Sequence, residues 1–584
     1  MELLKSFELL TNYLKKNALL YLTAVILIIL SNVDQALLPQ ILGKVTDGLK
    51  ERSIGREDII RYSLILLGIA VSYGVLFGLG QFTIMRLGRR FEFLTRGQIF
   101  AQFSRLSEDF FSKQGTGKLL SYVMNDVTSV REAISFGVTQ TTNAVFMVIS
   151  CVVMMLVTGI PVTLILVSVC PLVAIPFLVI YFGPRIRNRS MDVQEGLATM
   201  TESADEQIGG IRVTKTFAIE ETAQRRFDET VDGVRSAQLH LVRMSSLFQA
   251  LLPFLGALSL VVSLLVGGYM TIQGRMTLGS FVALTFYLRM LTGPLQQIGN
   301  VINMMQRSGA SLERVNRLLA RVPSVRDKDD ASDLARIGDI AVDHLTFSYP
   351  GTSEQALKDV SFTIPEGRTV GLIGRTGSGK STLAKLLLRI YEPPAGSIQV
   401  NGQDITRVTL ESLRRKIGYV PQDGFLFSTD IADNIAFSDR SASIEQIREA
   451  AAQALLLESV NSFEAGFETR LGERGLTLSG GQRQRASLAR GLMKKPELLI
   501  LDDSMSAVDA MTESGILGNL IRERSGKSTL IIAHRISSVQ HADEIIVLDQ
   551  GRIVQRGSHE ELMACPDGPY ASLYRIQQEG LQHA

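Results

Sequence analysis

The stretch GLIGRTGSGKST, residues 371–382, decides the fold of the C-terminal half of this chain. An apolar run leads to Gly374, four residues follow, and Gly379, Lys380 and Ser381 open a segment of helical pattern. Glycines in such a loop let backbone N–H groups surround phosphate oxygens, and the helix N-terminus adds partial positive charge. Lys380 is then placed to reach the β- and γ-phosphates, and Ser381 to ligate Mg²⁺.

From about residue 338 onward, strand patterns alternate with helical patterns, which predicts an α/β P-loop NTPase domain with parallel strands. Its expected cofactors are ATP and Mg²⁺. The residues predicted to hold nucleotide in this loop are Gly374, Thr376, Gly377, Ser378, Gly379, Lys380, Ser381 and Thr382.

The pentapeptide SGKST occurs a second time, at residues 525–529, in a different context. Ile521 stands where the first glycine of the loop is required, and a strand pattern follows in place of a helix. The second copy is therefore interpreted as a turn between a helix and a strand.

The acidic edge of the site is predicted by LLILDDS, residues 498–504. Four apolar residues form a buried strand that ends at Asp502, which is placed to hold Mg²⁺ directly or through water. Asp503 follows where a water-activating base would lie. Two acids at a strand end also suit a solvated turn, but a P-loop in the same domain favours the functional interpretation.

The N-terminal half contains the excess of apolar residues in a chain that is 46% hydrophobic and 20% charged. Runs almost free of charge approach or exceed the roughly 20 residues that cross a bilayer. They show no polar face at helical spacing, which disfavours buried helices of a soluble domain. The predicted fold is an all-α membrane domain whose helices cover 17–42, 62–85, 136–158, 162–182, 247–272 and 278–305.

Charge predicts the orientation of this multi-pass protein in the cell membrane. The basic segments 86–131 and 184–245 are expected in the cytoplasm together with the N-terminus and the nucleotide-binding domain. The first external connection is also basic, so the rule is not unanimous. The expected domains are 1–321 in the membrane, a linker at 322–337 and the nucleotide-binding domain at 338–584. Reversals near 114–127 and 206–217 are expected to dock against another part.

Overall charge and cysteine content exclude two classes of function. A net charge of +2 gives no indication of a nucleic-acid partner. The 3 cysteines are scattered and provide no disulfide or metal framework.

These motifs, together with LSGGQRQR at residues 478–485, resemble the nucleotide-binding domain of the ATP-binding cassette (ABC) superfamily. In that family the signature residues grip the γ-phosphate of a nucleotide held by another domain, so a single P-loop and a single signature imply a dimer. The signature positions are Ser479, Gly480, Gly481 and Gln482.

Further positions match the family one at a time. Tyr349 resembles the aromatic residue that stacks on adenine, and Gln422 the glutamine that senses Mg²⁺ and faces the membrane domain. Asp509 resembles the aspartate that crosses the dimer interface, and His534 the histidine that contacts the γ-phosphate. A core aromatic, a turn glutamine and a strand-end histidine remain the structural alternatives. Glu473 fits the exporter-type segment before the signature, or is a surface acid.

The layout resembles an exporter half-transporter, in which 114–127 and 206–217 would be the coupling helices. The family's usual residue at position 503 is glutamate, and the shorter Asp503 is expected to orient water poorly. The chain therefore resembles the degenerate-site half of bacterial heterodimeric multidrug exporters, whose partner would carry the glutamate. A homodimer with two slow sites is the alternative.

The expected substrate is a hydrophobic or amphipathic small molecule, because the spans hold few fixed charges. Asp34 and Arg289 are the main ones, and each lines a pathway, lies near the membrane interface or seals a helix pair. A lipid flippase, a peptide exporter and a non-pumping ATP-gated regulator stay open as alternatives.

Overall fold

The computed structural model describes residues 8–472, 475 and 478–582, and these fold as two compact units. The first unit extends to Ser104 and resumes over Thr116–Arg321. The second contains Arg105–Gly115 together with the chain from Val322 onward. The segment expected as a linker, 322–337, thus packs with the second unit. The short segment Arg105–Gly115, which lies between two long helices of the first unit in sequence, does so too.

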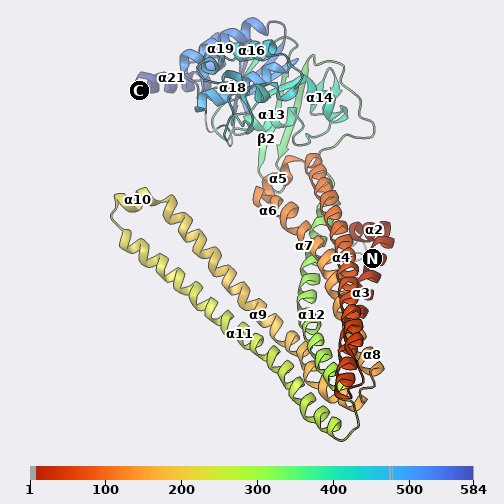
Figure 1. Cartoon of the computed structure of the whole chain (residues 1–584). Helices are drawn as coiled ribbons and strands as arrows, with labels where there is room; N and C mark the ends of the chain where they lie inside the picture. Colours follow the sequence, from red (N-terminus) through yellow and green to blue (C-terminus); the bar gives the residue numbers. More distant parts are fainter. Residues whose placement is uncertain (1–7, 473–474, 476–477, 583–584) are drawn as a thin grey trace. The chain divides into compact units, whose positions relative to one another are not determined.

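Six continuous helical stretches of the first unit are long and apolar enough to cross a membrane (Figure 1). This confirms the six-helix membrane fold. Each stretch continues beyond its apolar run, because the helical pattern does not end where the hydrophobic side chains end. The stretches are α3 (Ala18–Lys50), α4 (Arg56–Arg105), Gly117–Val157, α9 (Val162–Gly209), α11 (Glu220–Ile272) and α12 (Leu278–Leu319).

The third stretch includes two π-helical turns, η1 and η2. Its parts are α6 (Thr116–Ser121), η1 (Tyr122–Asp126), α7 (Val127–Glu132), η2 (Ala133–Gly137) and α8 (Val138–Val157). Two short helices complete the first unit, namely α2 (Glu8–Lys16) and α10 (Ile211–Thr216), which joins α9 to α11.

Small residues set the closest helix contacts, as is usual where helices pack within a membrane. A Cβ atom on Gly279 of α12 would lie 2.0 Å from the carbonyl oxygen of Gly43 on α3. Between α11 and α9, the buried Ser259 hydroxyl donates to the Ser168 carbonyl at 2.5 Å. Both contacts require side chains no larger than those present.

The second unit contains two sheets. The antiparallel sheet has the order β2-β1-β4-β5, and the larger sheet has the order β10-β9-β3-β8-β7-β6, with β10 alone antiparallel to its neighbour. The strands are β1 (Ile340–Ser348), β2 (Gln355–Ile364), β3 (Thr369–Gly374), β4 (Ile398–Val400), β5 (Gln403–Asp404), β6 (Ile417–Val420), β7 (Leu498–Asp502), β8 (Ser528–Ala533), β9 (Glu544–Asp549) and β10 (Arg552–Gly557).

The parallel strands of the larger sheet confirm the expected α/β domain. Because the smaller sheet is antiparallel, the domain contains both parallel and antiparallel strands. The described helices are α5 (Glu108–Gln114), α13 (Lys380–Leu387), α14 (Leu410–Lys416), α15 (Ile431–Ile435), α16 (Ile444–Gln453), α17 (Leu457–Asn461), α18 (Gly480–Met493), α19 (Ala510–Glu523), α20 (His559–Met563) and α21 (Pro569–Gln582), with 3₁₀ turns η3 (Ile405–Arg407), η4 (Ala436–Ser438), η5 (Gly466–Glu468) and η7 (Ile536–Ser538).

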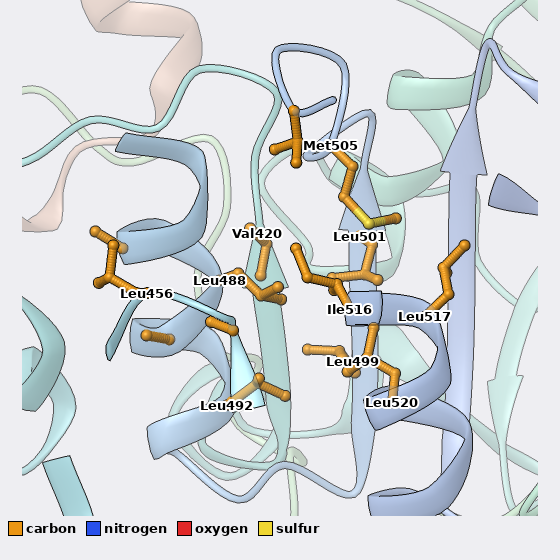
Figure 2. Packing of buried hydrophobic residues seen from close by; sticks show 14 of the residues in the cluster. Val420, Leu456, Leu488, Leu492, Leu499, Leu501, Met505, Ile516, Leu517 and Leu520 are labelled. Carbon is orange, nitrogen blue, oxygen red and sulfur yellow. The ribbon is translucent and has the colours of Figure 1, made fainter. Parts of the chain in front are cut away.

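Strand β7 is buried on both faces, which explains its unbroken apolar run. Leu499 and Leu501 face one helical layer, where α18 contributes Leu488 and α19 contributes Ile516 (Figure 2). Leu498 and Ile500 belong to the core on the opposite face, which includes side chains of α13. Burial on both faces fixes the point at which the strand delivers its two acids.

The second SGKST segment spans the turn after α19 and the first two residues of β8, as its context predicts. It provides no second phosphate loop in the described part of the chain.

Candidate nucleotide-binding site

The loop between β3 and α13 has the geometry of a phosphate cradle. Gly377 and Gly379 have φ angles of 81° and 103°, which side chains other than glycine adopt only with strain. A Cβ atom on Gly379 would also lie 2.6 Å from the carbonyl oxygen of Ala356. Helix α13 begins at Lys380, so its first N–H groups border the loop.

Lys380 holds the loop together through backbone carbonyls. Its ammonium group donates to the carbonyls of Gly374 at 2.8 Å and Arg375 at 2.9 Å. Burial of this side chain lowers the pKa of Lys380 to about 8, although the carboxylates of Asp503 and Asp502 oppose the shift. A phosphate would provide the negative charge that the buried ammonium lacks.

The acidic edge lies at the carboxyl end of β7, as predicted. The buried Asp502 carboxylate accepts from the Ser381 hydroxyl at 2.9 Å and from the Tyr419 hydroxyl at 3.2 Å. Burial raises its pKa, and the two hydrogen bonds oppose that shift. A carboxylate, a hydroxyl and the nearby Gln422 amide form the oxygen-rich set that suits Mg²⁺.

Asp503 adopts a left-handed backbone conformation with φ 47°. Its N–H donates to the carbonyl of Ile532 at 2.8 Å, which anchors the turn to β8. Its carboxylate accepts from the side-chain amide of Gln422 at 3.1 Å. The predicted base and the predicted sensor residue are therefore in direct contact.

An open cavity of about 730 Å³ brings most of the predicted residues together. It is large enough for a nucleotide and is lined by charged, hydroxyl and amide groups around the glycine loop. The predicted residues that line it are Tyr349, Thr376, Gly377, Ser378, Gly379, Lys380, Ser381, Thr382, Gln422, Asp502, Asp503 and His534.

Tyr349 lines the cavity and packs against a second aromatic residue, Tyr391, which does not line it. The Tyr349 hydroxyl shares a hydrogen bond with Thr382 at 2.9 Å, and its ring meets the ring of Tyr391 edge to face at 5.1 Å. The sequence analysis did not single out Tyr391, because its contact with Tyr349 forms only in the tertiary structure. Lys385 lies over the Tyr391 ring, with its nitrogen 5.8 Å from the ring centre.

The signature residues do not line the cavity of their own chain. Ser479 caps α18, accepting from the N–H of Gln482 at 3.3 Å, while the Gln482 side chain accepts from the N–H of Ser479 at 2.9 Å. Gly481 allows close approach to Ala507, whose carbonyl oxygen would lie 3.0 Å from an added Cβ atom. Gly374 is also absent from the residues that line the cavity, and its carbonyl accepts from Lys380.

Asp509 also lies away from the cavity. Its carboxylate caps α19 by accepting from the N–H of Thr512 at 3.0 Å, and this hydrogen bond lowers its pKa. Glu473 lies outside the described residues. Within the described chain, neither the signature residues nor Asp509 line the cavity around the phosphate loop, and Ser479 and Asp509 are exposed.

A short excursion of the chain docks beside this site. Helix α5 places Glu108 so that its carboxylate pairs with Lys385 of α13 at 2.7 Å. The Ser324 hydroxyl donates to the carboxylate of Asp109 at 2.8 Å. The docked segment is therefore 105–115, which shares only its last residues with the reversal expected at 114–127. The other expected reversal, 206–217, contains α10.

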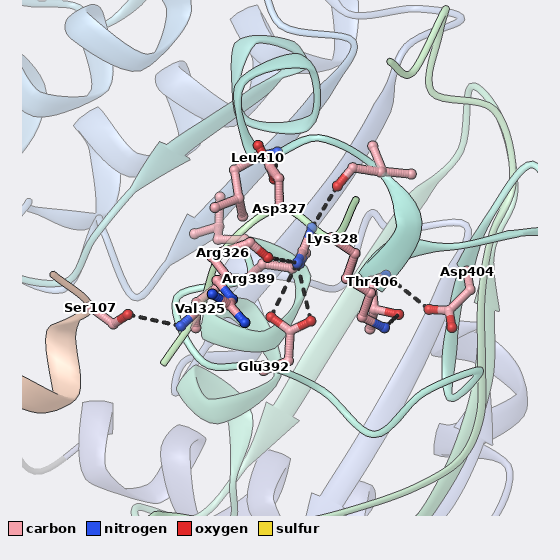
Figure 3. Close-up of polar contacts among 12 residues, drawn as sticks. Ser107, Val325, Arg326, Asp327, Lys328, Arg389, Glu392, Asp404, Thr406 and Leu410 are labelled. Atoms are coloured by element: carbon pink, nitrogen blue, oxygen red, sulfur yellow. Dashed lines mark hydrogen bonds and ion pairs between the residues drawn. The ribbon is translucent and has the colours of Figure 1, made fainter. Parts of the chain in front are cut away.

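Arg389, which follows α13, fixes the segment after α12 to the second unit (Figure 3). This buried guanidinium donates to the carbonyls of Val408 at 2.6 Å and Arg326 at 3.2 Å, and it pairs with Glu392 at 3.1 Å. The N–H of Val325 donates to the Ser107 hydroxyl at 3.0 Å, beside α5. Helix α13 thus begins at the phosphate loop and ends near the point where the segment after α12 contacts the segment that precedes α5.

Two family models match this chain. Residues 21–295 match the ABC transporter transmembrane region, and residues 357–506 match the ABC transporter model. The chain is 35% identical over 567 residues to a probable multidrug resistance ABC transporter ATP-binding/permease protein, YheI, of Bacillus subtilis, covering 97% of this chain and 96% of that protein.

Two other comparisons agree. The chain is 35% identical over 492 residues to an ATP-dependent lipid A-core flippase of Syntrophus aciditrophicus, covering 84% of this chain and 81% of that protein. The structure of a bacterial Atm1-family ABC exporter with ATP bound matches with a TM-score of 0.77 and 27% identity, over 97% of this chain and 98% of that one.

Proposed function

Since the chain belongs to the ABC transporter family and has the exporter fold, we propose that it uses ATP to export hydrophobic or amphipathic compounds across the cell membrane as one half of a two-chain transporter. The observation that carries this proposal is the cavity that gathers the P-loop, Asp502, Gln422 and His534 around a space of nucleotide size. The long apolar helices of the first unit provide the pathway.

A second nucleotide-binding domain is needed to complete the site. The cavity around the P-loop contains no signature residue among the described residues that line it. Because Ser479 and Gln482 cap α18 through reciprocal hydrogen bonds, the signature segment already has a defined conformation. In this conformation it could contact a nucleotide held by another chain. This supports a dimer in which each signature closes on the other chain's nucleotide.

Asp503 supports an unequal pair. Compared with glutamate, its side chain is one methylene shorter, which withdraws the carboxylate by roughly 1–1.5 Å, and such displacements can cost about a hundredfold in rate. The P-loop, Asp502 and His534 are intact, so this chain should still bind ATP and hydrolyse it slowly. The partner would then carry the faster site.

The chemistry of hydrolysis at this site divides among a few residues. Ser381, Asp502 and Gln422 would hold Mg²⁺, which neutralises phosphate charge when bound. Lys380 would exchange its carbonyl partners for phosphate oxygens. Asp503 would orient water, and His534, which lines the same cavity, would contact the terminal phosphate.

The orientation follows from connectivity. Helix α12 leads directly into the ATP-binding unit, and ATP is available in the cytoplasm. The ends of α4 and α9 near 105 and 209 would then also be cytoplasmic. The ion pair between Glu108 and Lys385 would transmit changes at the phosphate loop to the membrane helices.

The substrate class rests on the weakly charged spans. On α3, Asp34 accepts from the Ser72 hydroxyl at 2.6 Å and forms no ion pair within the described chain, while Arg289 on α12 is exposed. A multidrug exporter suits this surface. A lipid flippase is the second candidate, because a relative of this length bears that name. A peptide exporter or an ATP-gated regulator would share the scaffold.

The decisive experiment is to purify this chain alone and with the half-transporter encoded beside it, then to measure ATP hydrolysis and drug transport in vesicles. Weak activity alone and robust activity together are expected. Full activity of the chain alone would support the homodimer, and hydrolysis without movement of any drug or lipid would support a regulator.

A further inference from the structure

The backbone that carries His534 lies between two elements of regular structure. Strand β8 ends at Ala533 and the turn η7 begins at Ile536, so His534 and Arg535 belong to neither. Backbone groups in such a gap need hydrogen-bond partners outside the strand ladder. The His534 imidazole lines the nucleotide cavity but has no hydrogen-bond partner within the described chain, so its position depends on this backbone.

One side chain of the C-terminal helix provides both partners. The amide nitrogen of Gln577, on α21, donates to the carbonyl of His534 at 2.7 Å. The amide oxygen of the same side chain accepts from the N–H of Ile536 at 2.9 Å. These two hydrogen bonds hold the two peptide groups that flank Arg535, and they limit rotation of the backbone next to the histidine.

Helix α21 is itself anchored to the second unit. Tyr570, near its start, is fully buried, and its hydroxyl shares a hydrogen bond with Nδ1 of His559 at 2.8 Å. The N–H of Tyr570 donates to the side chain of Gln555 on β10 at 3.0 Å. Tyr570 and Ile536 also belong to one buried apolar cluster. Gln577 therefore reaches the His534 backbone from a fixed helix.

The same short segment is connected to the residues around Asp509. The guanidinium of Arg535 donates to the carbonyl of Val508 at 3.3 Å and pairs with the buried carboxylate of Glu513, on α19, at 3.2 Å. The backbone held by Gln577 thus joins the nucleotide cavity to the start of α19. A shift of this backbone would displace His534 and disturb the contact with Val508 together.

We propose that Gln577 is a positioning residue for His534, and that the C-terminal helix thereby forms part of the machinery for ATP hydrolysis. Gln577 does not line the cavity, so it acts on the nucleotide only through the backbone that it holds. This inference rests on the proposed function, in which the imidazole contacts the terminal phosphate of ATP.

The test removes both hydrogen bonds with Gln577→Met, which keeps the length and the helix propensity of the side chain. Single-turnover ATP hydrolysis is measured in the two-chain transporter whose partner carries glutamine in place of its catalytic glutamate. We expect a loss of roughly tenfold, less than the hundredfold that a displacement of about 1 Å can cost, because β8 still holds the other side of His534. Gln578→Met is the matched control, because this exposed neighbour makes no contact with the His534 segment, and it should leave the rate unchanged.

A double-mutant cycle separates positioning from general stability. In a His534→Ala background, Gln577→Met should cause no further loss, because the group that it positions is absent. Equal losses in the two backgrounds, or an unchanged rate in Gln577→Met alone, would overturn the proposal. Gln577→Glu keeps the acceptor for Ile536 but cannot donate to the His534 carbonyl when ionised. It should also slow hydrolysis, and it provides the measurement if the methionine variant does not fold.

Hydrogen exchange of the full-length complex without ATP distinguishes this inference from the proposed function. Gln577→Met should accelerate amide exchange in the segment that contains Ile536, whereas Gln578→Met should not. Equal exchange in both variants and the unaltered complex would overturn the proposal. An unaltered complex that hydrolyses no ATP would refute the proposed function, while faster exchange confined to Gln577→Met would still support the hold of α21 on the His534 backbone.

Discussion

Lengthening the carboxylate at position 503 should convert a slow ATP site into a faster one. The complex with the partner's matching glutamate changed to glutamine isolates this chain's own site. In that background, Asp503→Glu advances the carboxylate by roughly 1–1.5 Å, and we expect a rise of up to about a hundredfold in the single-turnover rate of ATP hydrolysis. The affinity for ATP should change little, because the P-loop, Lys380 and Ser381 are untouched.

The structure also predicts a small cost of this change. Asp503 has a φ of 47°, and aspartate tolerates the left-handed region better than glutamate does. A loss on the order of 1 kcal/mol in unfolding free energy is expected, and thermal unfolding with and without ATP would measure it. The contact with Gln422 at 3.1 Å must also rearrange.

Asp503→Asn is the control, because it keeps the side-chain length and removes the charge. It should hydrolyse ATP no faster than the unchanged chain in the same background. A folded, ATP-binding Asp503→Glu variant whose rate stays within about twofold of the original would refute the idea that carboxylate reach limits this site.

Four further outcomes are expected. Lys385→Met breaks a partly exposed ion pair with Glu108, so it should change the unfolding free energy by less than about 1 kcal/mol. It should nevertheless reduce the stimulation of ATP hydrolysis by drugs several-fold, with basal hydrolysis unchanged. An unaltered stimulation would count against transmission through this pair. Since the pKa of Lys380 is lowered to about 8 without a ligand, and bound phosphate raises it, ATP binding near pH 9 should take up almost one proton. Calorimetry in buffers of different ionisation enthalpy detects this uptake, and Lys380→Met should abolish it. By the same shift, the unfolding free energy without nucleotide should rise between about pH 8 and the ordinary lysine pKa, because the unfolded chain binds the extra proton there. Leu499→Ala leaves a cavity in the core beside α18 and should lower the unfolding free energy by about 2–5 kcal/mol, as chemical denaturation would show; a loss below 1 kcal/mol would mean that this strand is not buried on both faces.

The residues that position phosphate could be predicted because their chemistry is local. The glycine spacing at 374–379 determines the loop by itself, and the run 498–501 can be buried only if both faces of the strand are covered. Residues whose roles depend on contacts between distant segments could not be predicted from a local motif. Tyr391 and Lys385 acquire their neighbours only when the tertiary structure forms.

The segment that folds with the second unit, 105–115, lies just before the reversal predicted at 114–127, and the sequence contains a signal for it. Gly115 and Gly117 indicated a reversal, and Gly115 does end α5 with φ 71°. The break that matters comes earlier, at Ser107, which is extended and precedes Glu108 and Asp109 at the start of α5. A serine followed by two acids is a helix-start signal, and it was the evidence available in the sequence.

Because residues 105–115 fold with the ATP-binding unit although they lie between two membrane helices, the boundary between the parts is crossed more than once along the chain. Recombining this protein with a relative therefore calls for three junctions, near 104, 116 and 321. A hybrid joined only near 321 would retain the foreign version of α5 against α13 and lose the match at Lys385. The part of the chain that must be exchanged together in a hybrid is thus discontinuous in sequence. The residues of α5 and α13 should be replaced at the same time.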